Sequence, residues 1–299
     1  MAELFLVRYG ELTLKSPPVR REFESRLRRN ILDQFVREGI TSRLRADHGH
    51  LYVEADDGVR ARQVLKRIFG ITSFSAVEEV PSERSAIRER LLQVAEPRLV
   101  TGVRFAVRAR RTGQHPFTSQ ELARDLGADV LDRFADRHLR VDLGQPDVEL
   151  FVEVRGPRTY LYFDRTLGPG GLPLGVAGPL VALVDGPRGA LGAYLMMKRG
   201  CRVSIVTVPT GEPFVRDTLS RLDPRARAVV AGADPEERNR RLVEVAEESH
   251  ADGVVLPISV EEFAVARKRW GDRVLFSPTV AFTDAEVEER WRAVTALAH

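Results

Sequence analysis

The sequence has little cysteine and no long apolar run, and both shortages narrow what the protein can be. One cysteine, Cys201, excludes a disulfide within the chain and a zinc site built from two or four cysteines. No stretch is apolar for the length of a bilayer, and residues 1–10 lack the basic start and apolar core of a secretion signal. The turn histidines His48 and His50 have no further ligands nearby, which is typical of solvent-exposed positions. We therefore expect a cytoplasmic protein without a metal and without membrane contact.

Acidic residues are unevenly distributed in a chain that otherwise has the composition of a globular protein. Of its 299 residues, 43% are hydrophobic and 30% charged. Residues 1–165 hold 29 Lys and Arg against 25 Asp and Glu, whereas residues 166–299 hold 17 against 18. Residues 98–111 contain five arginines and no acid. A cationic stripe of this kind indicates a phosphate backbone as partner.

Hydrophobic periodicity predicts a β-α-β-β-α-β order at the start of the chain. The predicted strands and helices cover residues 3–9, 20–38, 41–45, 51–54, 58–69 and 71–80. The long helix follows Pro17 and Pro18. This order is typical of the ferredoxin-like arrangement, which we assign to residues 1–75.

Two further domains follow in the predicted pattern. Residues 76–165 contain predicted helices over 82–96 and 119–134, and predicted strands over 102–108, 148–154 and 159–163. Residues 166–179 are rich in Gly and Pro and are typical of a linker. From residue 180 to 299 strands and helices alternate, which predicts a doubly wound, parallel α/β sheet. The predicted fold is therefore a multidomain protein of the α+β and α/β classes.

A glycine-punctuated turn stands between the first strand and the first helix of this last domain. The stretch "LVDGPRGALGAYLMMKRG" (183–200) has the strand–turn–helix layout of a phosphate-binding loop. Its turn contains Asp185, Pro187 and Arg188, and no serine or threonine follows until Ser204. The layout alone leaves open whether the turn binds a nucleotide.

Several stretches, taken in order, resemble the tRNA 4-thiouridine synthetases, or ThiI family. "RYGELTLK" (8–15), "RREFESRL" (20–27) and "FGI" (69–71) resemble the ferredoxin-like domain of that family. "FAVRARRTGQHPFTSQEL" (105–122) is similar to the central motif of its RNA-binding THUMP domain. "GPGGLPLGVAG" (168–178) and "AYLMMKRG" (193–200) are similar to its linker and to the helix after its nucleotide loop.

The resemblance implies a tRNA partner, bound at the acceptor arm and 3′ end by the ferredoxin-like and THUMP domains, and it implies a homodimer. The RNA-binding candidates that it indicates are Lys15, Arg20, Arg21, Arg108, Arg110, Arg111, His115, Phe117, Thr118 and Ser119. The arginines from 108 to 111 are expected at the exit of a strand, where guanidinium groups can bind phosphate. Ser119 has a helix N-cap as its alternative role, and Phe117 has a core position as its alternative to base stacking.

The same resemblance predicts a degenerate PP-loop. The family's Ser-Gly-Gly-x-Asp-Ser loop, aligned on the helix without gaps, meets Val184, Asp185, Gly186, Pro187, Arg188 and Gly189. Both hydroxyls are missing, Asp185 brings a negative charge toward the phosphates, and Pro187 has no amide N–H. The family's thiolation also needs a reactive cysteine, whereas Cys201 lies at a helix–strand junction that is typical of a buried, inert thiol.

Other ligands for this turn remain open. Gly186, Gly189 and Gly192 form a G-x-x-G-x-x-G pattern, and some THUMP proteins are methyltransferases, but the strand over 202–208 ends without an acidic residue for a ribose. Gly186, Arg188 and Gly189 are candidates for binding a simple anion, with a purely structural turn as the alternative.

The hypothesis from the sequence is a tRNA-binding protein without ATP-dependent adenylation, one that assists an active thiolation enzyme. No cofactor and no catalytic residue are assigned under this hypothesis. The alternatives are an active tRNA sulfurtransferase, which would use ATP and Mg²⁺ with partner-supplied chemistry, and a THUMP-linked methyltransferase.

Overall fold

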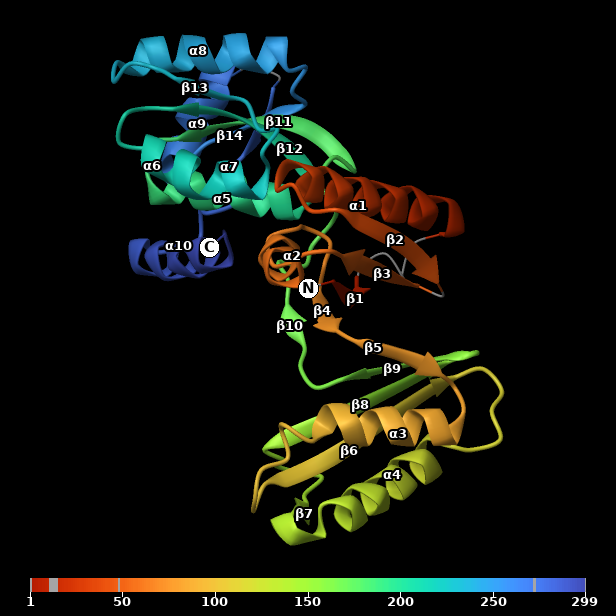
Figure 1. Cartoon of the computed structure of the whole chain (residues 1–299). Helices are drawn as coiled ribbons and strands as arrows, with labels where there is room; N and C mark the ends of the chain where they lie inside the picture. The colour runs from red at the N-terminus through yellow and green to blue at the C-terminus, as the bar shows by residue number, and fades with distance from the viewer. Residues whose placement is uncertain (1, 11–15, 48, 271–272, 299) are drawn as a thin grey trace. The chain divides into compact units, whose positions relative to one another are not determined.

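The computed structural model describes residues 2–10, 16–47, 49–270 and 273–298, and this part of the chain forms three five-stranded sheets (Figure 1). The chain divides into two compact units. The first contains residues 1–6, 52–54 and 75–166, and the second contains residues 7–51, 55–74 and 167–299. No helix among the described residues is long and apolar enough to span a membrane.

The first sheet has the predicted ferredoxin-like order of elements. These are β1 (Glu3–Arg8), α1 (Pro17–Arg37), β2 (Ser42–Asp47), β3 (His50–Ala55), α2 (Gly58–Leu65) and β4 (Ser73–Ala76). The strand order is β10-β4-β1-β3-β2, with the short β10 (Thr166–Leu167) at one edge. The prediction of a ferredoxin-like domain is confirmed.

Helix α1 begins three residues earlier than predicted, because the two prolines form its first turn instead of preceding it. Proline fits there, since the first helical residues have no intrahelical partner for an N–H. Leu27, Ile31 and Phe35, spaced four residues apart, are fully buried. Gly39, with φ of +66°, ends the helical run.

The strand predicted over 71–80 is two strands in two different sheets. β4 belongs to the first sheet, and β5 (Glu78–Pro81) belongs to the second. Between them the N–H of Val77 donates to the carbonyl of Leu4 at 2.8 Å. The sequence pattern continues across this change of partner, so periodicity alone could not reveal it.

The second sheet belongs to the domain predicted as THUMP. Its elements after β5 are α3 (Arg84–Ala95), β6 (Arg104–Thr112), α4 (Ser119–Arg133), a 3₁₀ turn (Ala135–Arg137), β7 (Arg140–Val141), β8 (Val148–Arg155) and β9 (Arg158–Tyr162). The strand order is β5-β9-β8-β6-β7. Helices α3 and α4 pack through Ile87, Leu91, Leu122 and Leu126 onto one face of the sheet.

The Gly- and Pro-rich connection is shorter than predicted. Thr166 and Leu167 form β10, and the last predicted linker residues, Ala177 to Pro179, already belong to β11 (Ala177–Val184). Gly171 has a φ of +72°, and a Cβ at this position would overlap the carbonyl oxygen of Lys198. The segment is therefore packed closely against the helix of the last domain.

The third sheet is parallel and doubly wound, as predicted. Its remaining elements are α5 (Pro187–Lys198), β12 (Cys201–Thr207), α6 (Glu212–Phe214), a π-helical turn (Val215–Leu219), α7 (Ser220–Leu222), β13 (Ala228–Val230), α8 (Pro235–Glu248), β14 (Gly253–Val255), α9 (Val260–Trp270), β15 (Val274–Phe276) and α10 (Asp284–Ala298). The strand order is β13-β12-β11-β14-β15.

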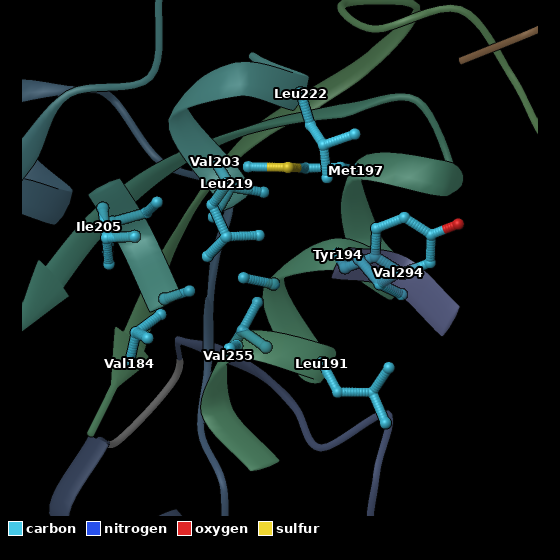
Figure 2. Close-up of a cluster of buried hydrophobic side chains, with 14 of the residues drawn as sticks. Val184, Leu191, Tyr194, Met197, Val203, Ile205, Leu219, Leu222, Val255 and Val294 are labelled. Carbon is cyan, nitrogen blue, oxygen red and sulfur yellow. The ribbon is translucent and has the colours of Figure 1, made fainter. Parts of the chain in front are cut away.

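Strand β11 lies at the centre of this sheet and is apolar on both faces. Leu180, Ala182 and Val184 point into the core shown in Figure 2, which also contains Tyr194 and Met197 of α5. The alternate residues, Val181 and Leu183, belong to a second core, together with buried residues of α8. A continuous apolar run is therefore required, because helices cover both sides of the strand.

Candidate nucleic-acid interface

Strand β6 of the second sheet is paired on one side over only part of its length. Its neighbour β7 pairs with Arg104 and Phe105 alone, whereas β8 pairs with β6 as far as Thr112. Beyond Phe105 the other side of β6 is therefore a sheet edge, with main-chain groups available for a partner. A cavity of about 570 Å³ lies along this edge, and residues of β6, β8 and the start of α4 line it together with Arg165.

Two arginines of this cavity have exposed guanidinium groups without an acidic partner. Arg110 on β6 and Arg165, which follows β9, make no ion pair within the described part of the chain. Arg165 lies over the ring of Phe151, 5.8 Å from its centroid. Arg110 is among the residues predicted from the sequence, whereas Arg165 is not, because it reaches this cavity, or groove, only through the pairing of β8 with β9.

Arg108 is placed differently from the prediction. It lies within β6, not at a strand exit, and its guanidinium binds Glu149 at 2.8 Å and the carbonyl oxygen of Leu143 at 2.7 Å. It lines the same cavity with its charge already balanced. Arg108 is thus a structural bridge between two strands and a loop.

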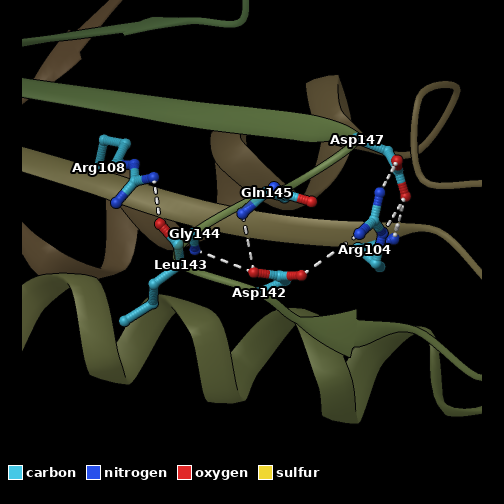
Figure 3. Close-up of polar contacts among 7 residues, drawn as sticks. All are labelled: Arg104, Arg108, Asp142, Leu143, Gly144, Gln145 and Asp147. Carbon is cyan, nitrogen blue, oxygen red and sulfur yellow. Dashed lines mark hydrogen bonds and ion pairs between the residues drawn. The ribbon is translucent and has the colours of Figure 1, made fainter.

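Figure 3 shows how the loop after β7 is held against β6. Arg104 forms an ion pair with Asp147 at 2.7 Å and a weaker one with Asp142 at 3.5 Å. Asp142 also accepts hydrogen bonds from the N–H groups of Gly144 and Gln145. Hydrogen bonds from Arg104 lower the pKa of Asp147 to about 2. These bonds hold the loop against β6, where Leu143 also accepts a hydrogen bond from Arg108.

The first turn of α4 presents amide groups to the cavity. Thr118, not Ser119, is the N-cap: its hydroxyl accepts from the N–H of Glu121, and the carboxylate of Glu121 accepts from the N–H of Thr118. Ser119 and Gln120 line the cavity, and no hydrogen bond of their N–H groups is present within the described residues. The cap alternative for Ser119 is therefore wrong, because its neighbour takes that role.

The remaining candidates, at the end of β6 and in the loop after it, differ in their exposure to solvent. Phe117 is 4% exposed and packs in the domain core, which favours the core alternative over base stacking. His115 stacks on Phe117 with ring centroids 5.5 Å apart and contacts the carbonyl of Thr112 at 3.2 Å. Arg111 is exposed, lies within β6 rather than beyond it, and donates to the carbonyl of Gly113.

Two of the candidates at the start of the chain, Arg20 and Arg21, lie in the first two turns of α1. Arg20 pairs with Glu24 at 2.9 Å, and the same carboxylate accepts from the hydroxyl of Tyr9 at 2.6 Å. Arg21 is exposed and makes no ion pair with a described residue. Lys15 lies outside the described residues.

In the third domain, the turn between β11 and α5 is held by its own chain. Arg188 donates to the carbonyls of Thr279 and Phe282 at 2.7 and 2.9 Å, and to Asp284 at 2.7 Å. A Cβ on Gly189 would overlap the carbonyl oxygen of Leu183, so this glycine permits close helix–strand packing. Gly186 is extended, with φ of 176°, and has open space beside it. These contacts favour the structural-turn alternative for Gly186, Arg188 and Gly189.

Asp185 in this turn and Cys201, the one cysteine of the sequence, are both at least partly shielded from solvent. Burial raises the pKa of Asp185, although the nearby Arg238 opposes the shift. Cys201 is 7% exposed, and burial raises the pKa of its thiol. The described residues contain no group of three His, Cys, Asp or Glu side chains suited to a metal; His50 is half-buried and His48 lies outside them.

Two stretches of the chain match known protein families, and these matches define the class of protein. Residues 83–164 match the family model of the THUMP domain, so this is a multidomain THUMP protein with the groove on that domain. Residues 4–75 match the family model of the ThiI ferredoxin-like domain. The chain therefore combines the ferredoxin-like domain of the ThiI family with a THUMP domain.

Several curated relatives are described as tRNA sulfurtransferases. A "probable tRNA sulfurtransferase" of Methanothermobacter thermautotrophicus is 40% identical over 210 residues, which are 68% of this chain and 52% of the relative. One from Methanosarcina acetivorans is 38% identical over 217 residues, 71% of this chain and 52% of the relative. The chain thus spans about half the length of these curated relatives.

Two solved structures share the fold along the whole chain. A Pyrococcus horikoshii protein has a TM-score of 0.82 and 25% identity, over 97% of this chain and 99% of that one. A 4-thiouridine synthetase solved as an RNA complex with bound ATP has a TM-score of 0.80 and 23% identity, over 100% of this chain and 86% of that one. At 23% identity, the similarity to the second structure shows a shared fold.

Proposed function

We propose that the chain binds tRNA at the acceptor arm and its 3′ end, using its THUMP and ferredoxin-like domains, and that it does not adenylate RNA. The groove along the open edge of β6 carries this proposal. It combines two unpaired arginines, Arg110 and Arg165, with the amide groups at the start of α4. Cations and helix-terminal amides are the groups that bind phosphate.

The shape of the groove favours a single-stranded end over a regular duplex. A cavity of about 570 Å³ can accept one nucleotide unit with its phosphate. Bases of a single strand are free to enter such a hollow and to meet guanidinium planes such as that of Arg165. The relatives' description as tRNA sulfurtransferases makes tRNA the natural source of this end.

The proposal of no adenylation rests on the contacts of the turn before α5. In the resembling family this turn supplies hydroxyls and free amides to ATP, whereas here Pro187 has no N–H and Arg188 is engaged with residues 279–284. The partly buried carboxylate of Asp185 adds a charge of the wrong sign for phosphate binding. These residues do not fit a triphosphate.

Under this proposal an active thiolation enzyme supplies the chemistry, and two copies of the chain associate as a homodimer. The competing function is a tRNA sulfurtransferase that still uses ATP, as the names of the relatives favour. Titration with labelled ATP and Mg²⁺ separates the two. We expect no saturable binding below millimolar ATP; micromolar, Mg²⁺-dependent binding would establish the competing function.

The RNA specificity is tested with three hairpins. One is an acceptor-arm minihelix with its single-stranded 3′ end, the second is the same minihelix with a blunt end, and the third is an anticodon-arm hairpin. We expect the first to bind at least about tenfold more tightly than the other two, because only it supplies an end for the groove. Equal affinities for all three would contradict recognition of the 3′ end.

A further inference from the structure

A second group of arginines lies where α1 meets the α/β domain, within the second compact unit. The amide of Asn30 donates to the carbonyl of Leu174 at 3.1 Å, and that of Gln34 donates to the carbonyl of Leu222 at 3.4 Å. These bonds direct one face of α1 toward the connecting segment and the end of α7 (Figure 1). Arg26 lies one turn before Asn30 on the same face, and Arg29 lies at the edge of that face.

Opposite this face, the α/β domain contributes two more arginines. Arg202, at the start of β12, binds both carboxylate oxygens of Asp223 at 3.0 Å. Arg225 pairs with Asp33 of α1 at 2.6 Å. Each of these guanidinium groups therefore already has one acid.

Arg26 approaches this pair without an acid of its own. A Cβ placed on Gly175 would lie 3.3 Å from Nε of Arg202 and 3.4 Å from Nη1 of Arg26, so both side chains pack against this glycine. Arg26 is half-buried, and among the described residues it forms no ion pair. Arg29, on the exposed rim, also lacks one.

The charges around Arg26 do not balance. Burial, together with the positive charges of Arg29, Arg202 and Arg225, lowers the pKa of Arg26, and Glu22 one turn earlier opposes this shift. The two other acids of the region, Asp33 and Asp223, are engaged by the arginines opposite. Repulsion of this kind costs stability unless an anion completes the cluster.

We propose that Arg26, Arg29 and Arg202 bind a phosphate group of the RNA backbone, so that the tRNA is also held where α1 meets the α/β domain. This rests on the RNA binding proposed above and adds a contact outside the THUMP groove. The hollow beside the cluster, lined by Asp33, Arg202 and Arg225, has a volume of only about 30 Å³. That is room for about one water molecule, which excludes a whole nucleotide and leaves a phosphate at the surface.

The test compares Arg26→Gln with Arg28→Gln in the full chain. Arg28 is an exposed arginine on the opposite side of α1, and it forms no ion pair with a described residue, so the two variants lose the same charge. For a full tRNA at 0.1 M salt, we expect Arg26→Gln to weaken binding about tenfold and to reduce the salt slope by about one, the effect of one lost phosphate contact. Arg28→Gln should change affinity by less than about twofold.

The same experiment includes controls for correct folding of the variants. Because Arg26 lacks an acid and is repelled by its neighbours, Arg26→Gln should melt at the wild-type temperature or above, and Arg26→Lys should keep part of the affinity. Inorganic phosphate at millimolar concentration serves as the probe for a free anion. If phosphate stabilises the wild type while Arg26→Gln binds tRNA normally, the site takes free anions only and the proposal is wrong.

The two proposals fail in different ways. If Arg26→Gln and Arg28→Gln bind tRNA equally well while substitutions in the THUMP groove weaken binding, the cluster contact alone is refuted. If the wild-type chain does not bind tRNA, the proposed function fails, and the cluster contact fails with it.

Discussion

Replacing Arg188 distinguishes a structural turn from an anion-binding one. The guanidinium is 25% exposed and donates to two main-chain carbonyls and to Asp284, whose own side chain is 96% exposed. The bond to Asp284 contributes little in water, whereas each hydrogen bond to a carbonyl contributes about 1–1.5 kcal/mol at this partly exposed position. Arg188→Ala should therefore destabilise the α/β domain by about 2–3 kcal/mol.

The two tryptophans, Trp270 and Trp291, make this loss measurable in one domain. Both lie in helices of the α/β domain, so their fluorescence on heating follows the unfolding of the compact unit that contains it. For a domain of this size the loss corresponds to a fall in Tm of about 8 °C. Arg199→Ala, an exposed arginine at the other end of α5, is the control and should lower Tm by less than about 2 °C. An unchanged Tm for Arg188→Ala, together with lost binding of phosphate or ATP, would refute the structural role.

Three further predictions concern stability and reactivity. In the folded protein the pKa of Asp147 falls from its ordinary value of 3.8 to about 2. Its pairing with Arg104 therefore stabilises the fold above about pH 4, and this stabilisation is lost as the pH falls toward about 2. The Tm difference between wild type and Asp147→Asn should shrink across that pH range. Gly189→Ala should lower the Tm of the α/β domain by several degrees, because its Cβ would overlap a carbonyl oxygen of β11, whereas Gly186→Ala should be tolerated; equal melting of the two variants would contradict this packing argument. The Cys201 thiol should react with a thiol reagent only after unfolding, and rapid labelling of the native chain would show that it is accessible.

The order of elements could be predicted from the sequence because most of them carry their own signal. The strands of the α/β domain are continuous apolar runs, as buried parallel strands must be, and α1 shows apolar residues four apart. Strand β6 was predicted too short, because its second half is an edge on which charged residues such as Arg110 face water. The local hydrophobic pattern therefore does not predict the part of a strand that is exposed to solvent.

The roles of individual arginines could not be predicted, because their partners are far away in sequence. Arg108 meets Glu149 only through the register of β6 with β8, and Arg188 meets residues more than 90 positions later. A sequence motif does not show whether the charge of an arginine is paired with an acidic residue in the fold. Only the fold separates Arg110, which is free to bind phosphate, from Arg108, which is not.

RNA binding along the open edge of β6 is the proposal on which the function depends. The most direct test is the dissociation constant of the acceptor-arm minihelix for the double variant Arg110→Gln/Arg165→Gln, with Arg140→Gln as control. Arg140 is an exposed arginine on β7, beside the opposite end of β6. At 0.1 M salt we expect about 30- to 100-fold weaker binding and a salt slope smaller by about two for the double variant, with the control unchanged. A double variant that binds as tightly as the control would contradict the claim.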